Sequence, residues 1–140
     1  MTADSGSSRN PVLVVDDDTV SRVVLAQMLR RMGFDVLEAD DVDPAIGMMA
    51  RSAVSAVFCD FSMPGGTGLD VLARLGRGPG RPVFILVTGI VDAARVDGAH
   101  VDAHLAARFD AVDAYLTKPV NTRALRACVD AVLSNRSSSP

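Results

Sequence analysis

Short apolar runs alternate five times with segments of helical periodicity, and this alternation restricts the fold more than any other feature of the sequence. The apolar runs predict strands at residues 12–15, 34–39, 56–60, 83–88 and 113–117. The patterns between and after them predict helices at residues 19–32, 43–50, 68–75, 91–109 and 121–133. Five consecutive strand–helix units indicate an α/β protein with a parallel sheet covered by helices on both faces.

Local signals mark the ends of several predicted helices and help to fix the topology. Asp18 and Asn121 have side chains typical of helix N-caps, and Pro44 suits the first turn of the second helix. Gly33 is placed to end the first helix. Right-handed crossovers leave few arrangements of five such units. We predict a flavodoxin-like, doubly wound, five-stranded parallel sheet of order 2-1-3-4-5 with five helices.

Composition limits the class of protein. The chain has 140 residues, of which 49% are hydrophobic and 22% charged, as in one globular domain. A net charge of −3 gives no basic surface for nucleic acid, and no apolar run approaches the roughly 20 residues of a membrane span. Cys59 and Cys128 lack metal-ligand spacing, so we expect reduced thiols. We expect a cytoplasmic domain at residues 10–135, with disordered tails at 1–9 and 136–140.

Polar residues follow the predicted strands at the sheet edge where open α/β proteins bind ligands. Asp16 and Asp17 follow the first strand and Asp60 ends the third, while Thr88 ends the fourth and Lys118 follows the fifth. Because strands 1 and 3 are neighbours in the predicted order, the three carboxylates should converge. Lys118 is the only lysine among 14 basic residues, which hints at a site that needs a compact ammonium group.

These residue types favour phosphoryl-group chemistry. Two carboxylates at 4 Å repel by roughly 4 kcal/mol at an effective dielectric of 20, so the cluster needs a cation or a protonated acid. Hard oxygen ligands suit Mg²⁺, which also draws phosphate oxygens toward a carboxylate and makes Asp60 a feasible nucleophile. Thr88 can donate a hydrogen bond to a phosphoryl oxygen, and Lys118 can place a positive charge beside it.

Four segments carry a family resemblance: VLVVDDDTVSR, VFCDFSMPGGTG, VFILVTG and AYLTKPV. In order and position they resemble the signature segments of response-regulator receiver domains, over about residues 11–134. The resemblance implies a two-component signalling protein in which Asp60 is the phosphoacceptor. It implies that Asp17 binds Mg²⁺ directly, with Mn²⁺ as an alternative ion. It also implies that Asp16 acts largely through water and that the Ser62 carbonyl is a further ligand.

The same resemblance assigns the remaining site residues and a function. Thr88 and Lys118 resemble the phosphoryl-binding pair, and a cis bond is expected before Pro119. Tyr115 occupies the position of an aromatic switch that turns inward when Thr88 engages the phosphoryl group. The implied function is a single-domain response regulator, phosphorylated by a histidine kinase or histidine phosphotransfer protein, that controls a partner protein. Such a chain is not an enzyme beyond assisting its own phosphorylation and autodephosphorylation, and it should contact neither nucleic acid nor membrane directly.

Three alternatives stay open. The spacing of Asp16, Asp18 and Val20 also fits haloacid-dehalogenase phosphatases, with Asp16 as nucleophile, although that family normally has an acidic pair after the lysine and here only Asp130 follows Lys118. A receiver-like module could bind its partner without phosphorylation. The sequence could also belong to a larger kinase or regulator.

The chain departs from the usual receiver pattern between Thr88 and Lys118. The spacing exceeds the family's by about two helical turns, on the order of 10 Å of helix. The additional residues fall around 91–110, so we expect a lengthened fourth helix region. Ser62 and Ile90 occupy positions that tune the lifetime of the phosphoryl group in this family. Because Ile90 is apolar and holds water poorly, we expect slow to moderate autodephosphorylation.

Overall fold

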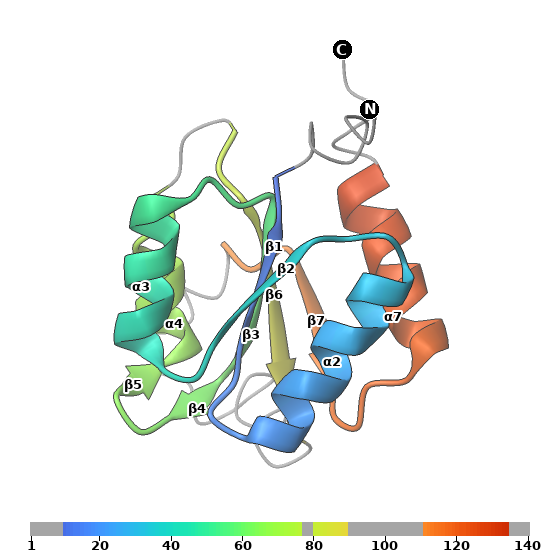
Figure 1. The fold of residues 1–140 in the computed structure, drawn as a ribbon, viewed down its shortest axis with the longest axis horizontal. Coiled ribbons are helices and arrows are strands. Elements are labelled where there is room, and N and C mark those ends of the chain that lie inside the picture. Colours follow the sequence, from blue (N-terminus) through green and yellow to red (C-terminus); the bar gives the residue numbers. More distant parts are fainter. Residues whose placement is uncertain (1–9, 77–79, 90–110, 135–140) are drawn as a thin grey trace.

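The central feature of the fold is one parallel sheet (Figure 1). The computed structural model describes residues 10–76, 80–89 and 111–134. The strands are β1 (Val12–Val15), β2 (Val36–Ala39), β3 (Ala56–Asp60), β6 (Val83–Thr88) and β7 (Ala114–Thr117). Their order is β2-β1-β3-β6-β7, which confirms the predicted flavodoxin-like order 2-1-3-4-5. All neighbouring strands are parallel, so their carboxyl ends lie along one edge of the sheet.

Helices cover both faces of this sheet. α3 (Val42–Arg51) and α4 (Gly68–Ala73) lie on one side, and α2 (Thr19–Arg31) and α7 (Thr122–Val129) on the other (Figure 1). The described residues therefore contain four α-helices where five were predicted over the whole chain. The predicted helix at 91–109, the lengthened fourth helix region and the predicted tails at 1–9 and 136–140 fall outside the described residues. None of the helices described is long and apolar enough to cross a membrane.

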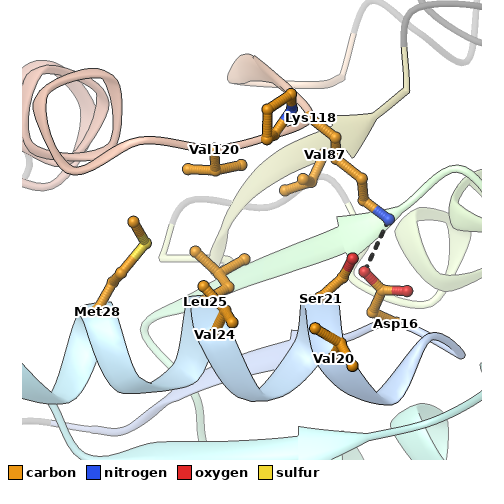
Figure 2. Close-up of a pocket in the computed structure, with 10 residues that line it drawn as sticks. Asp16, Val20, Ser21, Val24, Leu25, Met28, Val87, Lys118 and Val120 are labelled. Carbon is orange, nitrogen blue, oxygen red and sulfur yellow. Dashed lines mark ion pairs between the residues drawn. The ribbon is translucent and has the colours of Figure 1, made fainter.

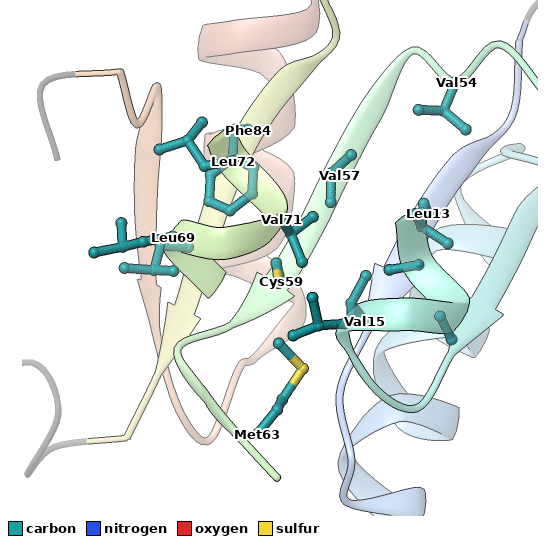
Figure 3. Packing of buried hydrophobic residues seen from close by; sticks show 14 residues of the cluster. Leu13, Val15, Val54, Val57, Cys59, Met63, Leu69, Val71, Leu72 and Phe84 are labelled. Atoms are coloured by element: carbon teal, nitrogen blue, oxygen red, sulfur yellow. The ribbon is translucent and has the colours of Figure 1, made fainter. Parts of the chain in front are cut away.

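Alternation along the strands divides the buried core into two clusters. Leu13 and Val15 of β1 belong to the cluster between the sheet and the helices α3 and α4 (Figure 3). Their neighbours Val12 and Val14 belong to the cluster on the α2 and α7 side. All four side chains are at most 1% exposed, and burying a side chain of this kind contributes roughly 1.5–3 kcal/mol. The central strands β1 and β6 are apolar, up to Thr88 at the end of β6, because both of their faces are buried.

Most helix ends follow the predicted signals. Asp18 caps α2 by accepting a hydrogen bond from the Ser21 N–H at 2.8 Å, and this bond lowers the pKa of the Asp18 carboxyl group. Asn121 caps α7 by accepting from the Ala124 N–H at 2.8 Å. α3 begins at Val42, one residue before the predicted start, because Asp41 is its N-cap. The final turn, Asp130–Ser134, is π-helical, where the sequence predicted a regular helix to residue 133.

The second strand is shorter than predicted because the end of α2 uses the residues before it. Gly33 adopts a φ of 99° after the helix, and its N–H donates to the Arg30 carbonyl at 3.0 Å. The Phe34 N–H then donates to the Leu29 carbonyl at 3.1 Å. This pair of bonds closes the helix in the manner of a Schellman motif. The strand β2 therefore begins at Val36 rather than at residue 34.

A small hairpin lies between β3 and α4, where the sequence predicted neither strand nor helix. β4 (Ser62–Met63) pairs antiparallel with β5 (Gly66–Thr67), and Pro64 and Gly65 form the turn. The Gly68 N–H donates to the Phe61 carbonyl at 2.8 Å and closes the base of the hairpin. The chain thus leaves β3 at Asp60, folds back on itself and enters α4.

Candidate functional site

Three carboxylates meet where β1 and β3 end. Val15 of β1 is paired with Cys59 of β3, so the next residues, Asp16 and Asp60, leave the sheet side by side. Carboxylate oxygens of Asp16, Asp17 and Asp60 all lie within 4.8 Å of one another. Asp16 is 4% and Asp60 7% exposed, whereas Asp17 is exposed. The strand order therefore brings together the three acids that the sequence placed at one edge.

Lys118 is the cation beside these acids. Its Nζ lies 2.8 Å from Asp16 Oδ2 and 3.5 Å from Asp60 Oδ1, and Figure 2 shows the contact with Asp16. The main chain fixes its position, because the Lys118 N–H donates to the Thr88 carbonyl at 2.8 Å and extends the pairing of β6 with β7. The peptide bond between Lys118 and Pro119 is cis, as the family resemblance implied. The Lys118 ammonium thus pairs with two of the three carboxylates, both of them buried.

The electrostatics single out Asp60. Burial raises the pKa of its carboxyl group to about 6, and the Asp16 carboxylate adds to this rise. The Lys118 ammonium and a 2.9 Å hydrogen bond from the Phe61 N–H act in the opposite direction without cancelling it. Burial would lower the pKa of Lys118, yet its contacts with Asp16 and Asp60 raise it above the ordinary value. Lys118 is therefore protonated at neutral pH, and Asp60 ionises at a cost.

The donor set fits a hard divalent cation. It consists of carboxylate oxygens, two groups are buried, and their charges are only partly balanced by Lys118. Such oxygen ligands with solvent on one side suit Mg²⁺ better than soft metals. Ser62 lies in β4, two residues beyond Asp60, with an exposed side chain. The sequence places its main-chain carbonyl on the segment that borders the acidic cluster.

Thr88 and Tyr115 lie on the two strands beyond β3. Thr88 ends β6 and is 2% exposed, and its hydroxyl donates to the Gly89 carbonyl at a long distance of 3.4 Å. Tyr115 lies in β7 opposite Leu86, and its side chain is 46% exposed. Ile90 falls outside the described residues. Asp60 of β3 is paired with Val87 of β6, the residue before Thr88. Thr88 therefore lies at the same edge of the sheet as Asp60.

Two contacts made by the residues that follow β1 and β2 were not anticipated from the sequence. Arg22 of α2 donates to the Asp16 carbonyl at 3.0 Å and forms an ion pair with Glu38 at 3.2 Å. Asp41 accepts a hydrogen bond from the Gly65 N–H at 3.0 Å. The position of Arg22, one helical turn after Asp18, was a signal that could have been used for the first contact. No local signal pairs Asp41 with Gly65.

An apolar groove begins at the ion pair and runs along α2 (Figure 2). Its volume is about 210 Å³, and its walls combine the helix with the chain around Pro119 and Val120. Val20 and Val24 of α2 line the groove and are 70% and 49% exposed. Together with Val23, which is 38% exposed, they lie three and four residues apart and form an exposed apolar strip on α2.

Comparison with known proteins agrees with the geometry. The family model described as the response regulator receiver domain matches residues 12–130. The chain belongs to the response-regulator receiver family. The transcriptional regulatory protein CpxR of Klebsiella pneumoniae is 34% identical over 124 residues, which cover 89% of this chain and 49% of CpxR. The phosphate regulon regulatory protein PhoB of Escherichia coli is 29% identical, covering 87% of this chain and 51% of PhoB.

Solved receiver structures have the same fold. The response regulator TrrA from Thermotoga maritima, in complex with Mg²⁺ and BeF, is 25% identical with a TM-score of 0.69, covering 87% of this chain and 97% of that chain. A receiver domain protein from Clostridium thermocellum has a TM-score of 0.75 at 21% identity, covering 91% and 97%, and supports the fold alone.

The family assignment bears on the alternative functions that the sequence left open. The acidic cluster in a receiver domain is typical of the phosphorylation site, so neither a haloacid-dehalogenase phosphatase nor a phosphorylation-independent module is favoured. The receiver spans about half the length of the curated relatives CpxR and PhoB. A cyclic di-GMP phosphodiesterase of Thermotoga maritima is 29% identical over 126 residues, 31% of its length, so receivers also occur within enzymes. The receiver family itself is one of signalling phosphoacceptors.

Proposed function

We propose that this receiver accepts a phosphoryl group on Asp60 from the phosphohistidine of a histidine kinase or histidine phosphotransfer protein, in the cytoplasm, and that it signals to a partner protein. The observation that carries the proposal is the Asp60 carboxylate itself. It is buried at the end of a central strand, has a raised pKa and lies 3.5 Å from the only lysine of the chain. A nucleophilic carboxylate needs this combination of restricted solvent and a neighbouring cation.

We assign the metal to the acidic cluster. Asp17 and Asp60 would bind Mg²⁺ directly with the Ser62 carbonyl, and Asp16 would act largely through water; Mn²⁺ suits the same oxygen donors. When bound, the ion supplies positive charge that offsets repulsion between the carboxylates and the phosphoryl oxygens. Lys118 adds its ammonium on the side of the cluster where Asp16 and Asp60 already hold it.

The transfer needs no further reactant. One Asp60 oxygen forms a bond to phosphorus while the bond between phosphorus and the donor's imidazole nitrogen breaks. The electron pair of that bond stays on the imidazole nitrogen. Asp60 then carries a phosphoryl group with about two negative charges at neutral pH. Lys118 compensates part of this charge, and the Thr88 hydroxyl, which donates to the Gly89 carbonyl at a long 3.4 Å, turns to donate to a phosphoryl oxygen.

The new charge is the signal. We propose that movement of Thr88 toward the phosphoryl group leaves space into which the half-exposed Tyr115 turns, and that this changes the surface read by the partner. Because Ser62 and Ile90 occupy the sequence positions that tune the lifetime of the phosphoryl group in this family, and Ile90 is apolar, autodephosphorylation should be slow to moderate. These steps make the receiver a phosphoacceptor that assists its own phosphorylation and dephosphorylation.

The apolar groove along α2 is the surface we assign to the phosphodonor protein. The donor must bring its histidine to Asp60, and the groove begins at Asp16 and Lys118, next to that carboxylate. The exposed Val20 and Val24 would be covered when an apolar surface of the donor lies along α2. A small phosphodonor needs no such contact.

The test is phosphorylation of the purified chain by acetyl phosphate with Mg²⁺, followed by intact-protein mass spectrometry. The wild type should gain one phosphoryl group, the Asp60→Asn variant should gain none, and a control variant at an exposed acid, Asp35→Asn, should behave as the wild type. Phosphorylation that survives Asp60→Asn but not Asp16→Asn would instead favour the phosphatase-like nucleophile. Absence of phosphorylation in the wild type, with beryllofluoride also failing to bind, would refute the proposal.

A further inference from the structure

Asp41 connects two loops that are far apart in sequence. It lies between β2 and α3, and Gly65 lies 24 residues later at the tip of the β4–β5 hairpin. Asp41 Oδ1 accepts the Gly65 N–H at 3.0 Å and the Val42 N–H at 2.8 Å. One carboxylate oxygen therefore serves the start of α3 and the hairpin at once. A residue that acted only as a helix cap would need no contact with the hairpin.

The shape of the hairpin tip matches this contact. A Cβ atom added at Gly65 would lie 2.9 Å from both carboxylate oxygens of Asp41, closer than real Cβ atoms come to such groups. At Gly66, whose φ is 151°, a Cβ would collide with the carboxylate of Asp70. Asp70 in turn accepts the Thr67 N–H at 2.8 Å. The two glycines thus allow the hairpin backbone to lie directly against two carboxylates.

This hairpin includes the segment that leads away from the reactive carboxylate. Its first strand begins at Ser62, two residues after Asp60, and its base is closed by the bond from the Gly68 N–H to the Phe61 carbonyl. The base is fixed by α4 and the tip by Asp41, so Ser62 lies between two anchored points. Release of the tip would leave Ser62 held by the bond at the base, by its pairing with Thr67 and by the burial of Met63, without the contact that ties the turn to the start of α3.

We propose that Asp41 is a positioning residue for the metal site: it holds the hairpin so that the Ser62 main chain stays against the acidic cluster, and it thereby sets the affinity for Mg²⁺. This inference rests on the proposed function, which assigns the Ser62 carbonyl as a ligand. Asp41 acts through the backbone of Gly65 and does not touch the reacting atoms. Replacing a residue that orients a metal ligand typically weakens metal binding by about 10- to 100-fold.

The experiment compares Mg²⁺ affinities, measured by calorimetric titration and by the rise in melting temperature with Mg²⁺ concentration. Asp41→Ala should weaken Mg²⁺ binding about tenfold, the lower end of the range for such outer residues. Asp41→Asn keeps an oxygen that can accept from both N–H groups, so it should bind Mg²⁺ nearly as the wild type does. Asn121→Ala removes the N-cap of α7 and lowers stability without touching the hairpin, so its Mg²⁺ affinity should be unchanged.

A second pair of variants tests the contact itself. Gly65→Ala should displace the Asp41 carboxylate and weaken Mg²⁺ binding about as much as Asp41→Ala does. In the Asp41→Ala background the added methyl group no longer meets a carboxylate, so Gly65→Ala should cause little further loss. Such non-additivity is expected of residues in direct contact and not of distant, independent sites.

The outcomes separate this inference from the proposed function. If the wild type does not bind Mg²⁺, the proposed function fails. If the wild type binds Mg²⁺ and Asp41→Ala binds it equally well, or if Asn121→Ala weakens binding as much as Asp41→Ala, the positioning role fails while the metal site stands. Full additivity of Gly65→Ala and Asp41→Ala would also contradict the positioning role.

Discussion

Replacement of Asp60 by Asn should stabilise the metal-free protein at neutral pH. The Asp60 side chain lies in a site where burial raises its pKa from 3.8 to about 6, despite the neighbouring Lys118. The ionised carboxylate therefore lowers the free energy of unfolding. Asn removes the charge and keeps an oxygen that can accept the 2.9 Å hydrogen bond from the Phe61 N–H. Asp60, the proposed phosphoacceptor, is thus expected to be a destabilising residue when no cation is bound.

The size of the effect follows from the pKa difference between the folded and unfolded states. A rise of about two units corresponds to at most about 3 kcal/mol, because one unit is worth about 1.36 kcal/mol. The exposed Asp17 marks the solvent-facing side of the site, so screening should reduce the gain to about 1–2 kcal/mol.

The dependence on pH has a definite sign. Because the pKa of Asp60 is higher in the folded state, that state binds more protons between about pH 3.8 and 6. The contribution of Asp60 to stability is therefore fully present below about pH 3.8 and is lost as the pH rises through 6. The advantage of the Asp60→Asn variant should grow over this window and stay constant above about pH 7.

Urea unfolding in EDTA, followed by far-ultraviolet circular dichroism from pH 4.5 to 8, measures this difference. The chain has no tryptophan, so the far-ultraviolet signal is the better probe. Asp35→Asn, at an exposed aspartate, is the matched control and should show no comparable gain at neutral pH. A difference between wild type and Asp60→Asn that is constant across the pH range, or an Asp60→Asn variant that is less stable at pH 7.5, would refute the reasoning.

Two further predictions concern the metal and the phosphodonor. Mg²⁺ should raise the melting temperature at pH 7.5. Its apparent affinity should fall by up to about tenfold per pH unit below pH 6, because protons and the cation compete for Asp60. Titrations at pH 5, 6 and 7.5 measure this dependence, and an affinity that does not change with pH would contradict it. Val24→Asp should slow phosphoryl transfer from a phosphodonor protein and leave the rate with acetyl phosphate unchanged. The ratio of the two transfer rates tests this prediction. Equal slowing with both donors would exclude the groove along α2 as a docking surface.

The sheet could be predicted from the sequence because each strand is a short apolar run with a helical pattern after it. Runs such as residues 83–88 are buried on both faces, so they contain no polar residue until Thr88 at the sheet edge. The burial of these runs also located the candidate site, because a polar residue that ends a buried strand must lie at the edge of the sheet. Strand order then explains why Asp16 and Asp60, 44 positions apart, become neighbours.

Features that depend on contacts between loops could not be predicted in this way. Asp43 with Pro44 has the local pattern of a helix start, yet Asp41 is the cap, because its carboxylate also receives the N–H of Gly65. The β4–β5 hairpin has strands of two residues, too short for periodicity to reveal, and the bonds at its base and tip join residues that no local pattern connects. The shortening of β2 has a similar cause, since the bonds that end α2 engage Phe34.

The resting site compensates its two buried acids unequally. Asp16 has the Lys118 ammonium at 2.8 Å and the Asp18 N–H at 2.9 Å, while Asp60 has the same ammonium at 3.5 Å and the Phe61 N–H at 2.9 Å. The one lysine therefore favours Asp16, and Asp60 carries the larger uncompensated electrostatic cost. A cation bound beside Asp60 relieves that cost, so the same imbalance that destabilises the metal-free fold adds to the free energy of metal binding. The carboxylate that is least stabilised at rest is thus the one on which a metal and a phosphoryl group can have the greatest effect.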